Sequence, residues 1–444
     1  MTSQPYHDDY WDERELWSRD QLAEYQLGAL KQQLAYVGSR SDLYRQRFAE
    51  VGFEPGDLRS LEDLTTLPVT RKGEYVDAIE RVPPFGPGVA CDPRDVRRVH
   101  FSSGTTSQPT PMCWSQRDLD RWADLYARSA YSQGVRDTDI YQCLFSFSWF
   151  VGGLGGTLSY QRIGATCIPG GSVDAQRQID TLFRYGTTCV GGTPSFMLHL
   201  AEVAQELGRD LRDSQVRRIM VGGEPGAGIP ATRQRIEELW DAECRDGYGS
   251  LEFQPIAWEC HRGAGGHLAE DFAYAEVLDP ETLDPVPDGQ RGVLVLTHLD
   301  KEACPLVRWW TGDVVVRDSS PCECGRTHAR LPGGVLGRAD DMLIVKGVNV
   351  FPSAVEDVLR RSPGTTGEFQ IVLDDEVRDP TTGFLSGLKM RVEFRDDAPE
   401  GAADQLSANL RNELKVRAAV LPLTPGTLPR TTHKASRLSE EGSA

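Results

Sequence analysis

Phe101-Ser-Ser-Gly-Thr-Thr-Ser-Gln-Pro-Thr110 is the most informative stretch of this 444-residue chain. It combines small hydroxyl residues with one glycine, and an apolar residue typical of a strand precedes them. Hydroxyl groups and free backbone N–H groups can converge on an anion, and phosphate oxygens need such donors when they leave water. The stretch lacks the Gly-Lys-Ser/Thr ending of a P-loop. A surface loop without a ligand is the alternative interpretation.

The composition is that of a globular protein with an acidic surface. Hydrophobic residues make up 39% of the chain and charged residues 26%, and a chain of this length is expected to form two or three domains. The formal net charge of −18 disfavours nucleic acid and anionic membranes as partners. The acidic residues 1–20 and the lack of 18 consecutive apolar residues predict neither a secretory signal nor a membrane span. Its ten cysteines are expected to be reduced, which favours a cytoplasmic location.

Apolar runs alternate with helical stretches between residues 95 and 250. The runs at residues 141–145, 165–168, 188–191 and 218–221 are followed by turns rich in glycine and proline. This alternation predicts a parallel α/β sheet, preceded by a helix over residues 11–37. Ligands of such sheets bind outside the carboxyl ends of the strands, where the glycine-rich turns lie.

The pattern changes after residue 265. Residues 274–278 and 292–298 are predicted to be antiparallel strands, which indicates a β-rich subdomain. Strands at 342–345, 369–373 and 388–394, with helices at 352–359 and 402–420, predict a small α+β domain. The fold class is therefore α/β, with a large N-terminal domain over residues 1–339 and a small, mobile C-terminal domain over 340–444.

Further motifs follow the first in a fixed order. They are Gly222-Gly-Glu-Pro225, Tyr248-Gly-Ser-Leu-Glu252, Thr311-Gly-Asp313, Gly337-Arg-Ala-Asp-Asp341, Lys346-Gly-Val-Asn-Val-Phe-Pro352 and Gly426-Thr-Leu-Pro-Arg-Thr-Thr-His-Lys434. From about residue 36 to residue 437, this ordered set resembles the adenylate-forming (acyl-CoA synthetase) superfamily, and within it the phenylacetate–CoA ligase-like family. The resemblance implies an enzyme, an acid–thiol ligase: a carboxylate attacks the α-phosphorus of ATP, and a thiol then displaces AMP.

The resemblance also implies a role for residues in each motif. Glu252 matches a Mg²⁺-linked glutamate, Lys434 matches the lysine that reaches the carboxylate and α-phosphate, and Asp340 matches the hinge between the domains. The residues implied to contact ATP or to serve the thiol step are Ser102, Ser103, Gly104, Thr105, Thr106, Gly223, Glu224, Pro225, Tyr248, Gly249, Asp313, Arg338, Lys346 and Gly347.

Two positions depart from the family pattern. The phosphate loop usually continues Gly-Lys-Pro, whereas this chain has Gln108 before the proline and so loses a cation. Leu251 stands where a Ser or Thr usually precedes the glutamate. Either change is expected to weaken ATP binding, and a degenerate nucleotide-binding protein without activity is therefore one alternative function.

An aromatic stretch follows the first predicted strands. Phe147, Trp149 and Phe150, with Phe196 further along the chain, are candidates for a flat pocket that binds an aromatic ring. An apolar strand without a ligand is the alternative. The proposed substrate, an aryl carboxylic acid, follows mainly from the resemblance.

The acceptor stays open between two kinds of partner. The leading hypothesis is an aryl-acid–CoA ligase that uses ATP, Mg²⁺ and coenzyme A. The alternative is transfer to a carrier-protein pantetheine, an amine or another small nucleophile. The oligomeric state stays open, with a homodimer as the candidate assembly.

Three cysteines and one histidine form a candidate metal site. Cys260, His267, Cys322 and Cys324 suit tetrahedral Zn²⁺ in a structural role. His261 and His328 are alternatives for the histidine ligand, and reduced cysteines packed in loops are the alternative to a metal site.

Overall fold

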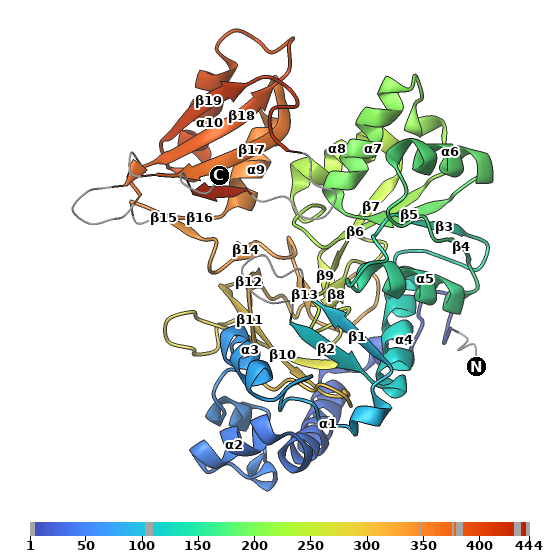
Figure 1. The fold of residues 1–444 in the computed structure, drawn as a ribbon, viewed down its shortest axis with the longest axis vertical. Helices are drawn as coiled ribbons and strands as arrows, with labels where there is room; N and C mark the ends of the chain where they lie inside the picture. The colour runs from blue at the N-terminus through green and yellow to red at the C-terminus, as the bar shows by residue number, and fades with distance from the viewer. Residues whose placement is uncertain are drawn as a thin grey trace.

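The computed structural model describes residues 5–102, 110–346, 348–374, 377–378, 385–429 and 437–440. They form a large N-terminal part and a smaller C-terminal part, which lies at the upper left of Figure 1. The large part contains an eight-stranded and a four-stranded sheet, and the small part has a four-stranded sheet of its own. This arrangement confirms the predicted α/β class, with a β-rich region between two α/β parts.

The eight-stranded sheet has the strand order β13-β9-β8-β7-β6-β5-β3-β4. Its parallel strands are β3 (Ile140–Cys143), β4 (Thr166–Ile168), β5 (Cys189–Gly192), β6 (Arg218–Gly222) and β7 (Glu243–Tyr248). Strands β3, β4, β5 and β6 match the four predicted apolar runs and confirm the predicted parallel sheet, to which β7 adds a fifth parallel strand. The antiparallel strands are β8 (Ala257–Trp258), β9 (Gly266–Leu268) and β13 (Arg330–Leu331). The helices around this sheet are α4 (Gln116–Ser132), α5 (Gly152–Ile163), α6 (Ala175–Tyr185), α7 (Pro194–Glu206) and α8 (Pro230–Trp240).

Local sequence explains why helix α6 lies where it does. Its N-cap Asp174 accepts a hydrogen bond from the N–H of Arg177, and Gly186 ends the helix in the left-handed region with φ 65°. Ile179 and Leu182, three residues apart, are buried on the face that packs on the sheet. A Gly-capped amphipathic helix between two apolar strands is the unit from which a parallel sheet is built.

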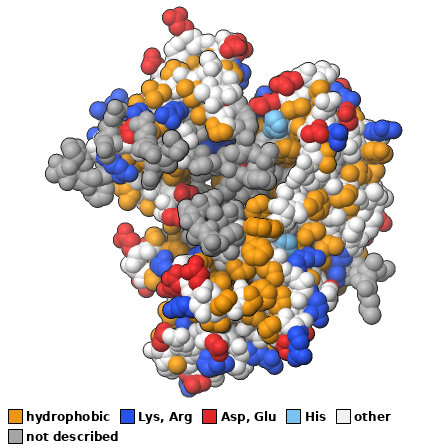
Figure 2. Space-filling model, viewed as in Figure 1, with side chains coloured by type: hydrophobic (Ala, Val, Ile, Leu, Met, Phe, Trp, Pro, Cys, Tyr) orange, Lys and Arg blue, Asp and Glu red, His pale blue; other side chains and the backbone are white. Residues whose placement is uncertain are grey.

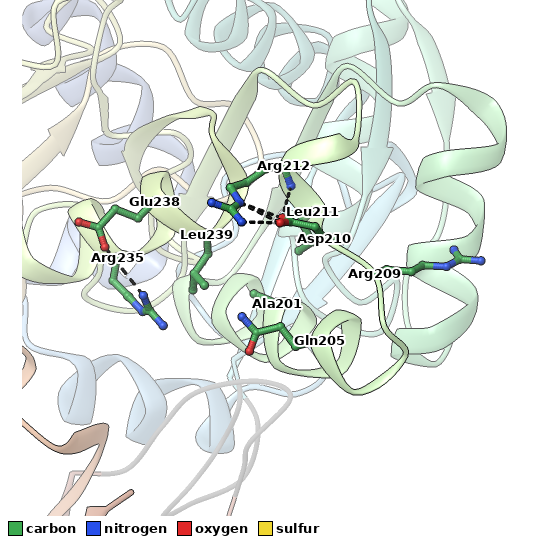
Figure 3. Close-up of a pocket in the computed structure, with 9 residues that line it drawn as sticks. All are labelled: Ala201, Gln205, Arg209, Asp210, Leu211, Arg212, Arg235, Glu238 and Leu239. Atoms are coloured by element: carbon green, nitrogen blue, oxygen red, sulfur yellow. Dashed lines mark hydrogen bonds and ion pairs between the residues drawn. The ribbon is translucent and has the colours of Figure 1, made fainter. Parts of the chain in front are cut away.

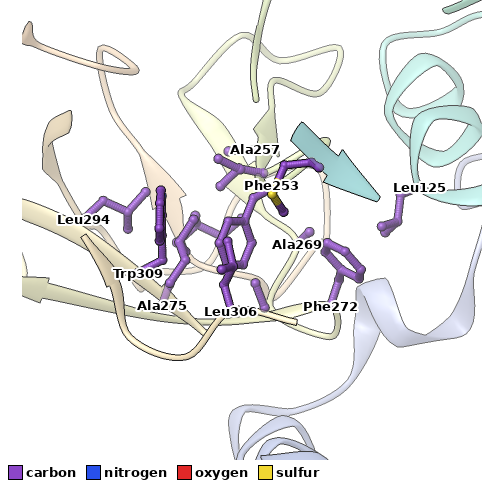
Figure 4. Packing of buried hydrophobic residues seen from close by; sticks show 14 of the residues in the cluster. Leu125, Phe253, Ala257, Ala269, Phe272, Ala275, Leu294, Leu306 and Trp309 are labelled. Carbon is purple, nitrogen blue, oxygen red and sulfur yellow. The ribbon is translucent and has the colours of Figure 1, made fainter. Parts of the chain in front are cut away.

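The second sheet is antiparallel and has the order β10-β11-β12-β14. Its strands are β10 (Ala273–Leu278), β11 (Arg291–His298), β12 (Trp309–Val316) and β14 (Gly337–Arg338), and the first two confirm the predicted antiparallel pair. Figure 4 shows Phe253, Phe272 and Trp309 packed together in the core beside this sheet. A separate hairpin of β1 (Arg98–Phe101) and β2 (Pro111–Trp114) packs onto the same core.

Helices cover the N-terminal end of the molecule. They are η1 (Glu13–Leu16), α1 (Arg19–Arg40), α2 (Asp42–Val51), η2 (Pro55–Asp57), η3 (Glu62–Thr66), α3 (Lys72–Arg81) and η4 (Pro93–Asp95), with η5 (Leu211–Asp213) further along the chain. Ser18 caps α1 through a capping box with Gln21. Leu30 and Leu34, four residues apart, are fully buried, which confirms a packed helix in this region. The predicted start at residue 11 was too early, because the chain forms η1 there and Ser18 caps α1 at Arg19.

The C-terminal part has its own core and sheet. Its elements are β15 (Leu343–Val345), β16 (Val348–Val350), α9 (Pro352–Arg361), β17 (Thr365–Leu373), β18 (Leu388–Phe394), α10 (Ala402–Leu414), β19 (Ala418–Leu423) and β20 (Leu438–Glu440), with sheet order β19-β18-β17-β20. The predicted helix over 402–420 was too long, because Lys415 adopts φ 62° and the chain then forms β19 beside β18. The domain boundary at residues 339–340 stays a prediction.

Charged side chains of both signs are interspersed over the face shown in Figure 2, and hydrophobic side chains gather across its central part. Among the residues that the structure describes, none of the helices combines the length and apolar character needed to cross a membrane.

Candidate active site

The carboxyl ends of β6 and β7 bring two predicted motifs to one edge of the large sheet. β6 ends at Gly222 and β7 at Tyr248, and the register pairs Gly222 with Gly247. A Cβ at Gly222 would lie 2.5 Å from the carbonyl oxygen of Gly247, so only glycine allows this approach. Glu224 accepts a hydrogen bond from the N–H of Ser195 (2.7 Å), which ties the turn over residues 222–225 to the start of α7. The turn and Tyr248, which the resemblance assigns to adenine, therefore lie at the same edge.

Asp313 lies at the centre of a polar cluster beside this edge. Its carboxylate accepts hydrogen bonds from the Tyr248 hydroxyl (2.5 Å) and from Nη1 of Arg338 (3.2 Å). Arg338, which pairs with Asp313 across β12 and β14, also donates from Nε to Asp340 (2.9 Å). Burial, followed by the charge of Asp313, raises the pKa of the Tyr248 hydroxyl well above its usual value, so the hydroxyl keeps its proton. Residues from three separate motifs thus meet at one carboxylate.

Glu252 lies in the turn that follows β7, with a side chain that is 8% exposed. The neighbouring Phe253 is fully buried and stacks on His298, with ring centroids 3.8 Å apart and planes inclined by 9°. The N–H of Ser250 donates to the carbonyl oxygen of Phe253 (2.8 Å), which closes the turn. Nζ of Lys72 lies 3.9 Å from Oε1 of Glu252, and no motif in the sequence marks this lysine. A largely buried carboxylate in a fixed turn is a suitable oxygen ligand for Mg²⁺.

The stem of the hydroxyl-rich loop is closed by hydrogen bonds between its ends. The N–H of Ser102 donates to the carbonyl oxygen of Thr110 (3.2 Å), and the N–H of Thr110 donates to Oγ of Ser102 (3.1 Å). The other predicted residues of this loop, Ser103, Gly104, Thr105, Thr106 and Gln108, lie outside the described residues. The hairpin β1–β2 therefore holds together the two ends of the predicted phosphate loop.

The predicted residues of the C-terminal part are only partly described. Asp340 is exposed between β14 and β15, and Lys346 is exposed in the turn between β15 and β16, with φ 49°. Gly347 and Lys434 lie outside the described residues. The carboxylate of Asp357 accepts a hydrogen bond from the N–H of Ala231 (3.3 Å), which joins α9 to α8 of the N-terminal part.

The four predicted aromatic pocket residues have different surroundings. Trp149 is 61% exposed, and its ring lies 5.3 Å from that of Phe101 at the stem of the hydroxyl-rich loop. Phe150 and Phe147 are half-buried, and Phe147 packs against the buried cluster that includes Tyr141 of β3 and Tyr160 of α5. Phe196, in the first turn of α7, packs in the cluster under α6 and α7. Their grouping into one aryl slot stays a prediction.

Cys260, His267, Cys322 and Cys324 form a buried cluster away from this edge. Their sulfur and nitrogen atoms all lie within 4.8 Å of one another. Nδ1 of His267 donates to the carbonyl oxygen of His328 (3.2 Å), and Nε2 faces Sγ of Cys324 at 3.5 Å. A metal-binding histidine is commonly oriented by such a second hydrogen bond.

The structure shows which of the three candidate histidines joins the cysteines. Both ring nitrogens of His328 lie against backbone carbonyl oxygens, those of Leu268 (2.9 Å) and Arg14 (3.0 Å), whereas His261 is exposed. His267 is therefore the histidine that joins the cysteines. A hydrogen bond from Cys260, with support from the neighbouring His267, lowers the pKa of the Cys324 thiol to about 2. A thiolate is the form of cysteine that binds metal.

A separate pocket of about 360 Å³ lies between α7, η5 and α8 (Figure 3). Its charged side chains are paired with neighbours: Arg212 with Asp210, Arg235 with Glu238, and Arg209 with Asp180 outside the pocket. No residue selected from the sequence lines it, so this pocket is not part of the candidate active site.

Two family models match most of this chain. The AMP-binding enzyme model matches residues 23–298, and the model of the AMP-binding enzyme C-terminal domain matches residues 347–441. The chain belongs to the AMP-binding enzyme family. It is therefore an adenylate-forming enzyme, as the ordered motifs indicated.

Relatives resemble this family member over nearly its whole length. Phenylacetate-coenzyme A ligase of Thermus thermophilus is 34% identical over 95% of this chain and 97% of that protein. The Escherichia coli enzyme of the same name is 32% identical over 96% of both chains. These identities confirm the resemblance to phenylacetate–CoA ligases.

A solved structure also matches the arrangement of the two parts. 2-Hydroxyisobutyryl-CoA ligase in its postadenylation state, in complex with 2-HIB-AMP, has a TM-score of 0.93 at 31% identity and covers 99% of this chain and 94% of that one. In its thioesterification state the same ligase has a TM-score of 0.75, over 98% and 93%. The two parts of this adenylate-forming enzyme are therefore arranged more as in the postadenylation state than as in the thioesterification state.

Proposed function

We propose that this enzyme activates an aryl carboxylic acid with ATP, releases pyrophosphate and transfers the acyl group to coenzyme A. The observation that carries this proposal is the meeting of Tyr248 and Arg338 at the carboxylate of Asp313, in a chain one-third identical to phenylacetate–CoA ligases. The exposed Trp149 near the phosphate-loop stem supports an aromatic acid.

The chemistry assigns a task to each group. The first step brings two anions together, so positioning and neutralisation of charge must supply most of the rate enhancement. Asp313 would accept hydrogen bonds from the ribose hydroxyls, and Glu252 would hold Mg²⁺ on the phosphates. Lys434 would neutralise the substrate carboxylate and α-phosphate as the new P–O bond forms and the bond to pyrophosphate breaks. In the second step the thiol attacks the acyl carbon and AMP leaves.

Acid-dependent ATP–pyrophosphate exchange tests the first step. The wild-type enzyme is assayed with substituted benzoates, cinnamates and phenylacetates, with 2-hydroxyisobutyrate as the aliphatic comparison. We expect exchange with one aryl class at a kcat/KM at least tenfold above the aliphatic acid. Exchange only with aliphatic acids would exclude an aryl substrate, and no exchange with any acid would indicate a degenerate nucleotide-binding protein.

The acceptor is identified by the product. With the preferred acid, ATP and coenzyme A, we expect stoichiometric acyl-CoA and AMP. If coenzyme A gives no product but a pantetheinylated carrier protein or an amine does, the alternative acceptor is correct.

We also propose that Cys260, His267, Cys322 and Cys324 hold a structural Zn²⁺. Tetrahedral Zn–S bonds of about 2.3 Å place sulfur atoms about 3.8 Å apart, and the ligand atoms here all lie within 4.8 Å of one another. Zinc would join the loops around β9 and β13 and would release the thiol protons on binding.

Metal analysis of the purified protein tests the zinc proposal. We expect about one zinc per chain, its loss in Cys322→Ser, and a lower melting temperature in that variant. Cys91→Ser, at a half-exposed cysteine outside the cluster, is the matched control. Metal-free wild-type protein with an unchanged melting temperature in Cys322→Ser would contradict the proposal.

A further inference from the structure

Lysine is scarce in this chain, since only seven of its 48 basic residues are lysines. In the described part of the chain, Lys389 and Lys301 pair with buried or half-buried carboxylates, and Lys415 donates to a backbone carbonyl oxygen. Lys72 differs because its side chain is 52% exposed and its ammonium lies 3.9 Å from Glu252. A charge-assisted hydrogen bond would be about 2.7–2.9 Å long, so the ammonium forms a loose ion pair with this carboxylate and no hydrogen bond.

The position of Lys72 is fixed by the packing of α3 against β12. The N–H of Trp310 donates to the carbonyl oxygen of Thr70 (2.9 Å), which lays the start of α3 beside this strand. Arg71 lies over the Trp310 ring at 4.4 Å, and Tyr75 packs edge-on against Trp309 at 5.7 Å. Lys72 and Tyr75, three residues apart, lie on the same side of α3, and Nζ of Lys72 lies 3.9 Å from the carboxylate of Glu252.

The acidic residue in the same helical turn does not neutralise Lys72. Glu74 pairs with Arg47 (3.1 Å) and accepts a hydrogen bond from the N–H of Arg71 (3.2 Å). The ammonium is therefore positioned for an anion that arrives beside Glu252. This matters in a chain with net charge −18, where Gln108 replaces the lysine usual in the family's phosphate loop.

We propose that Lys72 binds the β- and γ-phosphates of ATP, the part that leaves as pyrophosphate. This inference rests on the proposed adenylation activity. Glu252 would hold Mg²⁺, which would offset the charge of this carboxylate and leave the Lys72 ammonium available to phosphate oxygens. Lys72 thus supplies, from α3, the positive charge that the phosphate loop lacks.

The two half-reactions separate a phosphate-binding role from a structural one. The acyl-adenylate has lost the β- and γ-phosphates, so Lys72→Ala should affect only its formation. We expect kcat/KM for MgATP in pyrophosphate exchange to fall about 10- to 100-fold, the scale of one charge-assisted hydrogen bond. Thioester formation from supplied acyl-adenylate and coenzyme A should stay within twofold of wild type. Lys72→Arg should recover part of the exchange, and Lys31→Ala, at an exposed lysine of α1, is the matched control.

Unchanged exchange in Lys72→Ala, or an equal loss in both half-reactions, would overturn the assignment. If the wild-type enzyme shows no exchange with any acid, the proposed function fails. Equilibrium binding of MgATP to wild type and Lys72→Ala then decides the phosphate contact separately, since equal affinities would refute it and weaker binding by the variant would support it.

Discussion

Asp313→Asn is the substitution that tests most directly how the nucleotide is held. Asparagine keeps the size of the side chain and one acceptor oxygen but removes the charge and the second acceptor. The carboxylate, 9% exposed, accepts hydrogen bonds from Tyr248 and Arg338. One hydrogen bond to a charged group contributes about 1.5–3 kcal/mol, which corresponds to a loss of roughly 10- to 150-fold in kcat/KM for ATP.

The assay is pyrophosphate exchange with ATP and with 2′-deoxy- and 3′-deoxy-ATP. If Asp313 accepts the ribose hydroxyls, the wild-type enzyme should lose activity with at least one deoxy analogue, and Asp313→Asn should lose little more with that analogue. Such non-additivity is the signature of a direct interaction. Asp288→Asn, at a partly exposed carboxylate paired with Arg317, is the control.

Two results would refute this reasoning. One is an unchanged KM for ATP in Asp313→Asn. The other is a full additional loss with each deoxy analogue, which would place the ribose elsewhere. Melting temperatures of both variants show whether Asn at 313 disturbs the pairing of β12 with β14.

Three further substitutions test other parts of the molecule. Lys434→Ala should abolish exchange and leave ATP binding largely intact, and fully retained exchange would exclude its assigned role. His298→Leu removes the ring that stacks on Phe253, so we expect a several-fold higher Mg²⁺ requirement for exchange, whereas an unchanged requirement would show that the stack does not position Glu252. Asp271 is fully buried, and although burial raises the pKa of its carboxyl, Arg128 and other cations hold that pKa well below its usual value. Its contribution to stability is therefore present above about pH 4 and is lost as the pH falls further. Asp271→Asn should lower the free energy of unfolding by about 3–5 kcal/mol at pH 7 and remove this pH-dependent part, as denaturant titrations at pH 3–7 would measure. A pH dependence identical to that of wild type would contradict the interpretation.

Local patterns in the sequence predicted most of the secondary structure. Apolar runs followed by Gly- and Pro-rich turns marked the parallel strands, because a fully buried strand and its turn are encoded within a few residues. The same reasoning failed after residue 414. There the amphipathic pattern of α10 continued, but the left-handed residue Lys415 ends the helix and pairing with β18 makes the following residues a strand.

The sequence by itself determined the order of the motifs, the α/β class and the cysteines of the buried Cys–His cluster, because each is carried by neighbouring residues or by their types. The tertiary structure decided which charged and polar groups meet. The fold places His267 among the cysteines, whereas both ring nitrogens of His328 lie against backbone carbonyl oxygens. The packing of α3 on β12 brings Lys72 close to Glu252. Contacts between groups so distant in the chain depend on how whole elements pack, and no local pattern of residues records that packing.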